Sequence, residues 1–209
     1  HVEACTAEVL KPRNFAAQCH STLLLVERSR QLAELDADDD AQFSLSASNA
    51  DVFDPKISWG THLNVSVTSQ LWEDLFTRHH RPALLGYVSS AIAAGIAFFG
   101  QGYLLPLKDG MVYSTAGRTH QISELHTHST VEAFGRGILN ERREPHAENC
   151  DRLHLIGFDF ALAGAALMCS YVQCLLAAAE EGFADMTLLH PVRALRQWSW
   201  CLDMQTGRL

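Results

Sequence analysis

Residues 140–159 read NERREPHAENCDRLHLIGFD, a stretch in which arginine, histidine and acidic residues crowd together directly before apolar residues typical of a core strand. Pro145 disfavours helical geometry at Glu144 and predicts a stiff loop that presents Arg142 and His146 ahead of the strand. Guanidinium groups in such a loop can bind a phosphate or carboxylate through two parallel hydrogen bonds. The same cluster is also compatible with a solvated salt-bridge network at a strand edge. The stretch therefore predicts either an anion site or a charged surface loop.

A second polar pattern lies upstream of this loop, in residues 59–66, WGTHLNVS. Successive side chains of a strand point to opposite faces, so the alternation places three polar side chains on one face: His62, Asn64 and Ser66. A polar row of this kind suits a ligand, a metal ion or water. An antiparallel sheet with one wet face produces the same alternation without any bound ligand.

The remaining segments predict a mixture of strands and helices. Apolar residues recur at helical spacing in residues 15–35, 71–77, 83–99, 161–181 and 191–198, whereas residues 1–9, 43–47, 59–66, 111–114 and 153–160 are typical of strands. These elements follow no regular strand–helix–strand order, and neither glycine-rich phosphate-loop motif occurs. The sequence therefore predicts an α+β fold in which any nucleotide would bind on a sheet.

The charge balance and the cysteines limit the partners and the compartment that we expect. The chain of 209 residues carries a formal net charge of −8, so we expect neither nucleic acid nor an anionic membrane as a partner. The most apolar segment, residues 83–99, is interrupted by serines and glycines and is expected to be a buried helix rather than a membrane span. The six cysteines show no paired spacing, which favours a reducing, cytoplasmic compartment.

Four segments, in the same order along the chain, resemble the family of Pup ligases and Pup deamidases/depupylases, which attach or remove a prokaryotic ubiquitin-like protein, Pup. Residues 1–9, HVEACTAEV, resemble the family's HPE(Y/F)xTxEC strand, and residues 58–64, SWGTHLN, resemble SYGxHEN. Residues 138–159 resemble IINTRDEPHAD followed by RRLH and a Gly-Asp strand end. Residues 191–200, PVRALRQWSW, resemble P(I/V)xA(I/L)xx(V/I)S. The resemblance covers nearly the whole chain.

The resemblance implies a glutamine synthetase-like fold, in which a curved antiparallel sheet carries helices on one face and binds ATP on its concave face. It implies that residues 1–209 are the central part of a single catalytic domain, with an N-terminal strand and a small C-terminal domain outside this sequence. The implied activity is that of an ATP- and Mg²⁺-dependent carboxylate–amine ligase. Such an enzyme joins the C-terminal glutamate of Pup to lysines of protein substrates.

The matched motifs also imply roles for individual residues. Glu3 matches a magnesium-binding glutamate of the family, and a hard cation of this kind takes carboxylate and phosphate oxygens together. Nucleotide-binding roles fall on four positions: Thr6, His62, Asn64 and His154. Catalytic roles fall on three: Arg142, His146 and Arg152. The arginines are expected to neutralise negative charge that builds up during phosphoryl transfer.

Several positions depart from the family motifs and leave other functions open. Leu63 replaces a glutamate, Arg143 replaces the aspartate of NTRDEPH, and Ala161 replaces an asparagine. The alternatives are a Pup deamidase or depupylase of the same fold, a small-molecule amidoligase of the glutamate–cysteine ligase type, and a non-catalytic homologue that binds a partner or nucleotide without turnover.

Overall fold

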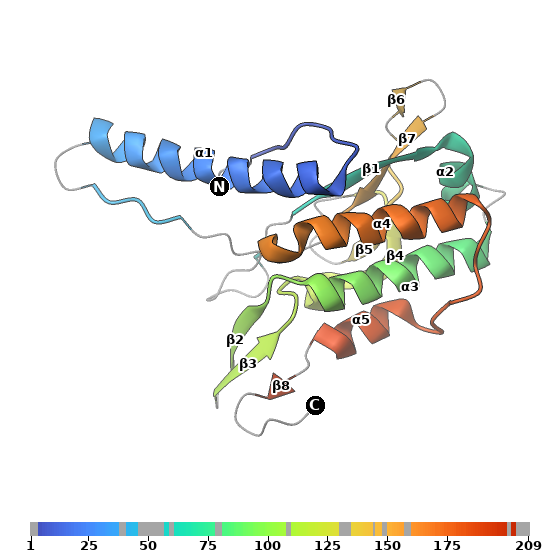
Figure 1. Ribbon diagram of the computed structural model, residues 1–209. Coiled ribbons are helices and arrows are strands. Elements are labelled where there is room, and N and C mark those ends of the chain that lie inside the picture. The colour runs from blue at the N-terminus through green and yellow to red at the C-terminus, as the bar shows by residue number, and fades with distance from the viewer. Residues whose placement is uncertain are drawn as a thin grey trace.

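The computed structural model describes residues 4–37, 41–45, 57–58, 61–77, 81–107, 110–129, 135–143, 145–147, 150–156, 160–199 and 202–203. Helices lie side by side across one face of a mixed sheet, and a second, smaller sheet lies at one end of the helical layer (Figure 1). The predicted α+β fold is confirmed.

The helical layer runs in the order α1 (Pro12–Asp36), α4 (Ala165–Glu180), α3 (Pro82–Phe99) and α5 (Pro191–Ser199), and α2 (Ser69–Phe76) lies near its end (Figure 1). Proline occupies the first turn of α1, α3 and α5, where its missing N–H costs no hydrogen bond. Thr68 caps α2, because its hydroxyl accepts a hydrogen bond from the Leu71 N–H at 3.2 Å. Two short 3-10 helices complete the helical segments, η1 (Thr119–Gln121) and η2 (Leu162–Gly164).

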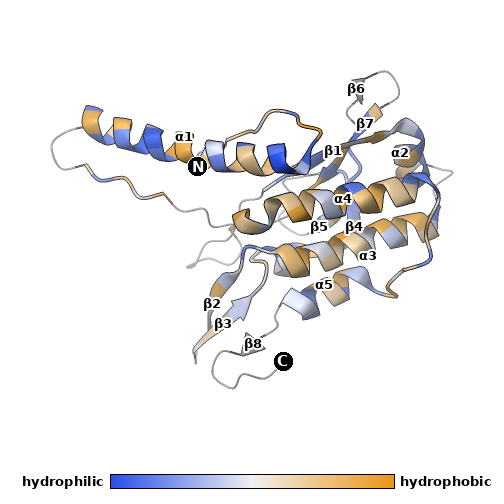
Figure 2. Ribbon diagram, viewed as in Figure 1, coloured by the Kyte–Doolittle hydropathy of each residue, from blue (hydrophilic) through white to orange (hydrophobic). Residues whose placement is uncertain are grey.

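α3 is the central helix of the core, and it is apolar on nearly every side (Figure 2). Pro82–Phe99 and Leu162–Glu180 are both long and apolar enough to cross a membrane by length and composition, a test that core helices also pass. Of the 18 residues of α3, 61% are buried inside the protein, as expected for a buried helix. α3 packs closely on α4 at Gly95, where an added Cβ would lie 2.8 Å from Cε1 of Tyr171.

The main sheet has the strand order β1 (Leu63–Thr68), β7 (Cys150–Leu155), β5 (Arg136–Asn140) and β4 (Ile122–Thr127), and β6 (Pro145–Ala147) also pairs with β7. β7 pairs antiparallel with β1, β5 and β6, as predicted. β4 and β5 pair parallel, which differs from the purely antiparallel sheet that was expected.

The smaller sheet consists of β2 (Tyr103–Leu107), β3 (Gly110–Ser114) and β8 (Leu202–Asp203), all paired antiparallel. The predicted strand over residues 111–114 is confirmed as part of β3.

Two of the predicted strands are wrong in the described residues, and a third is shorter than expected. Residues 4–9 and 41–45 form no strand, because neither segment pairs with a neighbour, and a strand needs one to satisfy its backbone hydrogen bonds. β1 begins at Leu63 rather than at residue 59, so His62 lies immediately before the strand. The helix predicted for residues 161–181 begins four residues later as α4.

Candidate functional site

The register between β1 and β7 decides which polar side chains lie together. Asn64 pairs with His154 and Ser66 with Arg152, and Asn140 of β5 pairs with His154 on the other side. Directly opposed residues point to the same side of a sheet. We call this side the polar face and define it by five residues: Asn64, Ser66, Asn140, Arg152 and His154.

The opposite side of the same strands is mostly apolar and packs against the helices, with Asp151 opposite Val67 as its buried charged residue. Leu63 pairs with Leu155, and both side chains are buried in the core. The departure from the family motif at Leu63 therefore lies on the helix-facing side of β1, where an apolar side chain suits its surroundings. It removes no charge from the polar face.

His154 is the most buried ionisable group of the polar face and is only 7% exposed. Its ring meets the ring of His62 edge-on at a centroid distance of 4.8 Å. Burial, together with the positive charges of His62, Arg152 and Arg142, lowers the pKa of His154 from 6.5 to about 4. The imidazole is therefore neutral at physiological pH, with one donor and one acceptor nitrogen. Neither nitrogen has a hydrogen-bond partner among the described residues.

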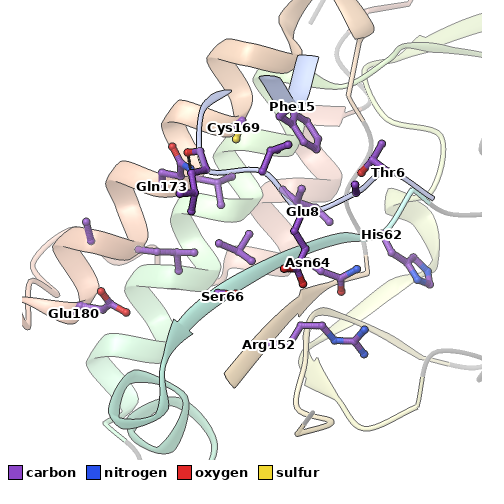
Figure 3. Close-up of a pocket in the computed structure, with 18 residues that line it drawn as sticks. Thr6, Glu8, Phe15, His62, Asn64, Ser66, Arg152, Cys169, Gln173 and Glu180 are labelled. Carbon is purple, nitrogen blue, oxygen red and sulfur yellow. Dashed lines mark hydrogen bonds between the residues drawn. The ribbon is translucent and has the colours of Figure 1, made fainter. Parts of the chain in front are cut away.

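An open pocket of about 700 Å³ lies along the outer edge of β1, next to the polar face. Residues 6–10, β1, the start of α1 and one side of α4 form its walls (Figure 3). Its polar lining includes Thr6, Glu8, His62, Asn64, Ser66, Arg152, Gln173 and Glu180. Three of these side chains point to the same side of β1 in Figure 3, namely His62, Asn64 and Arg152.

The loop that carries Arg142 is anchored at its start by Asn140, which is fully buried. The Asn140 side chain accepts a hydrogen bond from the Arg142 backbone N–H at 2.9 Å and donates one to the carbonyl of His128 at 3.1 Å. Glu141 donates its backbone N–H to the Thr127 carbonyl at 3.0 Å. The Arg142 side chain is exposed, yet it lies close enough to the polar face to lower the pKa of His154.

Arg143 points away from the polar face, towards α2. Its guanidinium donates two parallel hydrogen bonds to Asp151, Nε to Oδ1 and Nη2 to Oδ2, both at 3.0 Å. Asp151 is 1% exposed, and the hydrogen bonds from Arg143 hold the pKa of its carboxyl below the usual value. The guanidinium also reaches Glu73 at 3.4 Å and lies 4.9 Å from the centre of the Trp72 ring. Sequence reasoning treated Arg143 as a departure near the site and missed this ion pair.

The structure brings most of the predicted site residues together. The pocket wall includes four of them, namely Thr6, His62, Asn64 and Arg152, and His154 lies beneath His62. Arg142 lies at the edge of this group, on its loop. Glu3 lies outside the described residues; for His146 the structure describes the backbone in β6 but not the side chain.

Sequence reasoning missed Glu8 as a pocket residue. Glu8 reaches from the extended N-terminal segment towards β1 (Figure 3). The signal that could have found it is its place two residues after Thr6, which puts both on the same side of an extended chain.

The chemistry of the pocket fits a nucleotide. Its volume lies in the range of small-molecule and cofactor sites, about 300–1,000 Å³. His62, Asn64 and Arg152 line the pocket and point to the same side of β1 (Figure 3), which suits phosphate oxygens. His154 does not line the pocket itself but lies against the ring of His62. Magnesium is usually held by one or two carboxylates together with phosphates. Glu8 and Glu180 each place a carboxylate in the pocket wall, and the described residues contain no group of three or more side chains able to hold a metal ion by themselves.

Comparison with known proteins finds one matching family and solved structures with a similar fold. A family model described as Pup-ligase protein matches residues 1–207. A structure of the Pup ligase PafA of the prokaryotic ubiquitin-like modification pathway in complex with ADP matches with a TM-score of 0.73 and 24% identity, over 96% of this chain and 43% of that chain. A crystal structure of the complex between Pup and its ligase PafA matches with a TM-score of 0.63 and 22% identity, over 93% of this chain and 38% of that chain.

These likenesses to solved structures concern the fold, and this chain spans less than half the length of either matched chain. No curated protein matches the sequence. The family model covers almost the entire chain. The chain belongs to the Pup-ligase protein family.

Proposed function

We propose that this protein is an ATP- and Mg²⁺-dependent carboxylate–amine ligase that joins the C-terminal glutamate of Pup to lysines of protein substrates. The observation that supports it is the gathering of His62, Asn64, Arg152 and His154 beside one pocket, in a member of the Pup-ligase family. The similarity to a PafA structure in complex with ADP supports a nucleotide as a ligand, and we propose that pocket as its site.

In this proposal the polar face binds the phosphates of the nucleotide. Arg152 supplies a charged donor, and His154 supplies an N–H that has no partner among the described residues. His62 and Asn64 extend the donor set along the start of β1, and Thr6 faces them across the pocket. Because His154 is neutral, one ring nitrogen carries a hydrogen and can donate it to a phosphate oxygen. The other ring nitrogen can accept a hydrogen bond from a separate donor.

Bound ATP would supply the phosphoryl group that converts the Pup glutamate into a reactive acyl-phosphate, and magnesium would neutralise part of the phosphate charge. Arg142 and Arg152 would stabilise the charge that develops as this group transfers, since phosphoryl transfer depends mainly on positioning and electrostatics. We also propose Glu8 as a carboxylate that helps Glu3 to hold magnesium in the pocket.

The partners and the compartment follow from the same proposal. Pup and lysine-bearing proteins would be the macromolecular partners, and neither nucleic acid nor a membrane is required. Each cysteine in the described part of the chain is a free thiol, which supports a cytoplasmic, reducing location.

The decisive experiment measures equilibrium binding of ATP to the purified protein, with and without magnesium, followed by a conjugation assay with Pup and a lysine-bearing protein. Arg152→Gln should weaken ATP binding by about tenfold or more, because a charged hydrogen bond is worth roughly 1.5–3 kcal/mol. Arg28→Gln is a matched control, since Arg28 lies exposed on α1 away from the pocket residues.

Three results would distinguish the alternatives. Binding together with conjugation supports the ligase. Binding with release of Pup from conjugates, and no conjugation, would instead identify a depupylase. Absence of ATP binding by the wild-type protein would overturn the proposal and favour a non-catalytic homologue.

A further inference from the structure

Arg142 is exposed, but both of its neighbours in the chain are tied down. On one side, the Glu141 backbone bonds to Thr127, and its carboxylate meets Nδ1 of His126 at 2.6 Å. On the other side, Arg143 binds Asp151. Besides the hydrogen bond of its own backbone N–H to Asn140, the orientation of Arg142 therefore depends on contacts that its neighbours make with β4, β7 and α2.

The anchor at Arg143 is the more rigid of the two. Its guanidinium has a bidentate partner in Asp151, a third contact in Glu73 and the ring of Trp72 beneath it. The planar guanidinium fork fixes direction as well as distance in such a pair. Asp151 is buried and has a further hydrogen bond with Ser69, so removing Arg143 would leave its carboxylate without a charged partner, and the loop would be expected to rearrange.

The charges of this pair are the reverse of those in the family motifs quoted above. Where NTRDEPH has an aspartate, this chain has Arg143, and where RRLH has its first arginine, this chain has Asp151. Taken one at a time, each change reverses a charge next to the site. Taken together in this structure, they form one ion pair with two 3.0 Å hydrogen bonds.

We propose that Arg143 and Asp151 are a charge-reversed pair of positioning residues that hold the Arg142 loop over the polar face. The two substitutions compensate each other, so the change at Arg143 preserves the geometry of the site instead of marking its loss. The catalytic part of this inference rests on the proposed function of Arg142, whereas the positioning of the loop does not.

The test uses four forms of the protein: wild type, Arg143→Gln, Arg143→Asp and the double variant Arg143→Asp/Asp151→Arg. The first measurement is hydrogen exchange of the Arg142 backbone amide by NMR, because this amide bonds to Asn140 and reports on the loop directly. Exchange should be about tenfold faster or more in both single variants, since the loop then opens more readily, and the double variant should restore most of the protection.

The second measurement is turnover with ATP and Pup. Both single variants should lower kcat by about tenfold or more while the KM for ATP changes little, because a small misplacement of a catalytic group acts on the transition state. Glu73→Gln is the matched control. It removes the exposed contact of Arg143 but not the buried one, so kcat and exchange should both stay close to wild type.

A double variant as impaired as the single ones in amide exchange would overturn the proposal, as would single variants with unchanged exchange. If Arg143→Asp does not fold, folding of the double variant is itself the expected rescue, and failure of both would count against it. A wild-type protein without turnover would refute the proposed function, and the exchange measurements would still decide whether the pair positions the loop.

Discussion

Replacing His154 with phenylalanine should make the unliganded protein more stable and should weaken nucleotide binding. Phenylalanine keeps a ring against His62 but removes two buried nitrogens that have no partner among the described residues. A buried polar atom without a hydrogen bond costs about 1–3 kcal/mol. We therefore expect the free energy of unfolding to rise by about 1 kcal/mol or more near neutral pH. ATP binding should weaken by about tenfold or more, because a donor to phosphate is lost.

The same substitution should flatten the dependence of stability on pH. The folded-state pKa of His154 is lowered from 6.5 to about 4, so within this window the unfolded chain binds a proton that the folded chain does not. The contribution of the neutral His154 ring to the free energy of unfolding is fully present above about pH 6.5 and is lost as the pH falls towards 4. One pKa unit corresponds to about 1.4 kcal/mol, which makes the whole loss about 3 kcal/mol and the loss between about pH 7 and 5 roughly 2 kcal/mol.

Urea denaturation at about pH 7 and about pH 5, followed by tryptophan fluorescence, measures this difference directly. The wild-type protein should lose about 2 kcal/mol more than His154→Phe between the two conditions. His20→Phe is the control, because His20 lies exposed on α1, and it should behave as the wild type. Equal losses in wild type and His154→Phe would refute the assignment of a buried, neutral imidazole. Destabilisation of His154→Phe at neutral pH would show that the ring nitrogens have partners in the folded protein.

Three further predictions concern catalysis, metal binding and packing. Arg142→Ala should slow turnover by about a hundredfold or more if its side chain acts on developing charge, and a change confined to KM would instead make it a ground-state binding residue. Glu3→Ala should abolish the magnesium-dependent part of ATP binding without altering the fold; unchanged affinity in titrations with and without magnesium would contradict its assignment as a ligand. Gly95→Val should lower the free energy of unfolding by about 2 kcal/mol, because its Cβ would press on Tyr171, and a denaturation midpoint equal to wild type would contradict that packing.

Much of the local structure could be predicted from the sequence, because it depends on nearest neighbours. Helices begin at the prolines at residues 12, 82 and 191. Proline favours the first turn of a helix because its fixed φ suits the helix and its missing N–H costs no hydrogen bond there. The apolar composition of residues 83–99 predicted a buried helix, and α3 is the centre of the core. The alternation around Asn64 predicted which side chains share a face, and β1 follows it from Leu63 onward. These predictions succeed because a period of two or of about 3.6 residues is set by backbone geometry alone.

The motif resemblance predicted residues for the candidate site, but it could not show how they are arranged. Only the β1–β7 register decides that Asn64 meets His154 and that Ser66 meets Arg152. Only the packing around that row buries His154 and lowers the pKa of its ring. The sequence also marked Arg143 as a reversed charge near the site, whereas the fold turns it towards α2 and pairs it with Asp151.

The sequence by itself therefore determined the periodicity of each element, the polar face of β1 and the set of charged residues near it. The tertiary structure decided the parallel pairing of β4 with β5, the absence of a strand at residues 4–9 and the pairing of Arg143 with Asp151. The reason is physical: the direction of a side chain along its own strand is a local property, whereas strand register and ion pairing depend on segments that lie far apart in the chain and meet only when the core is packed.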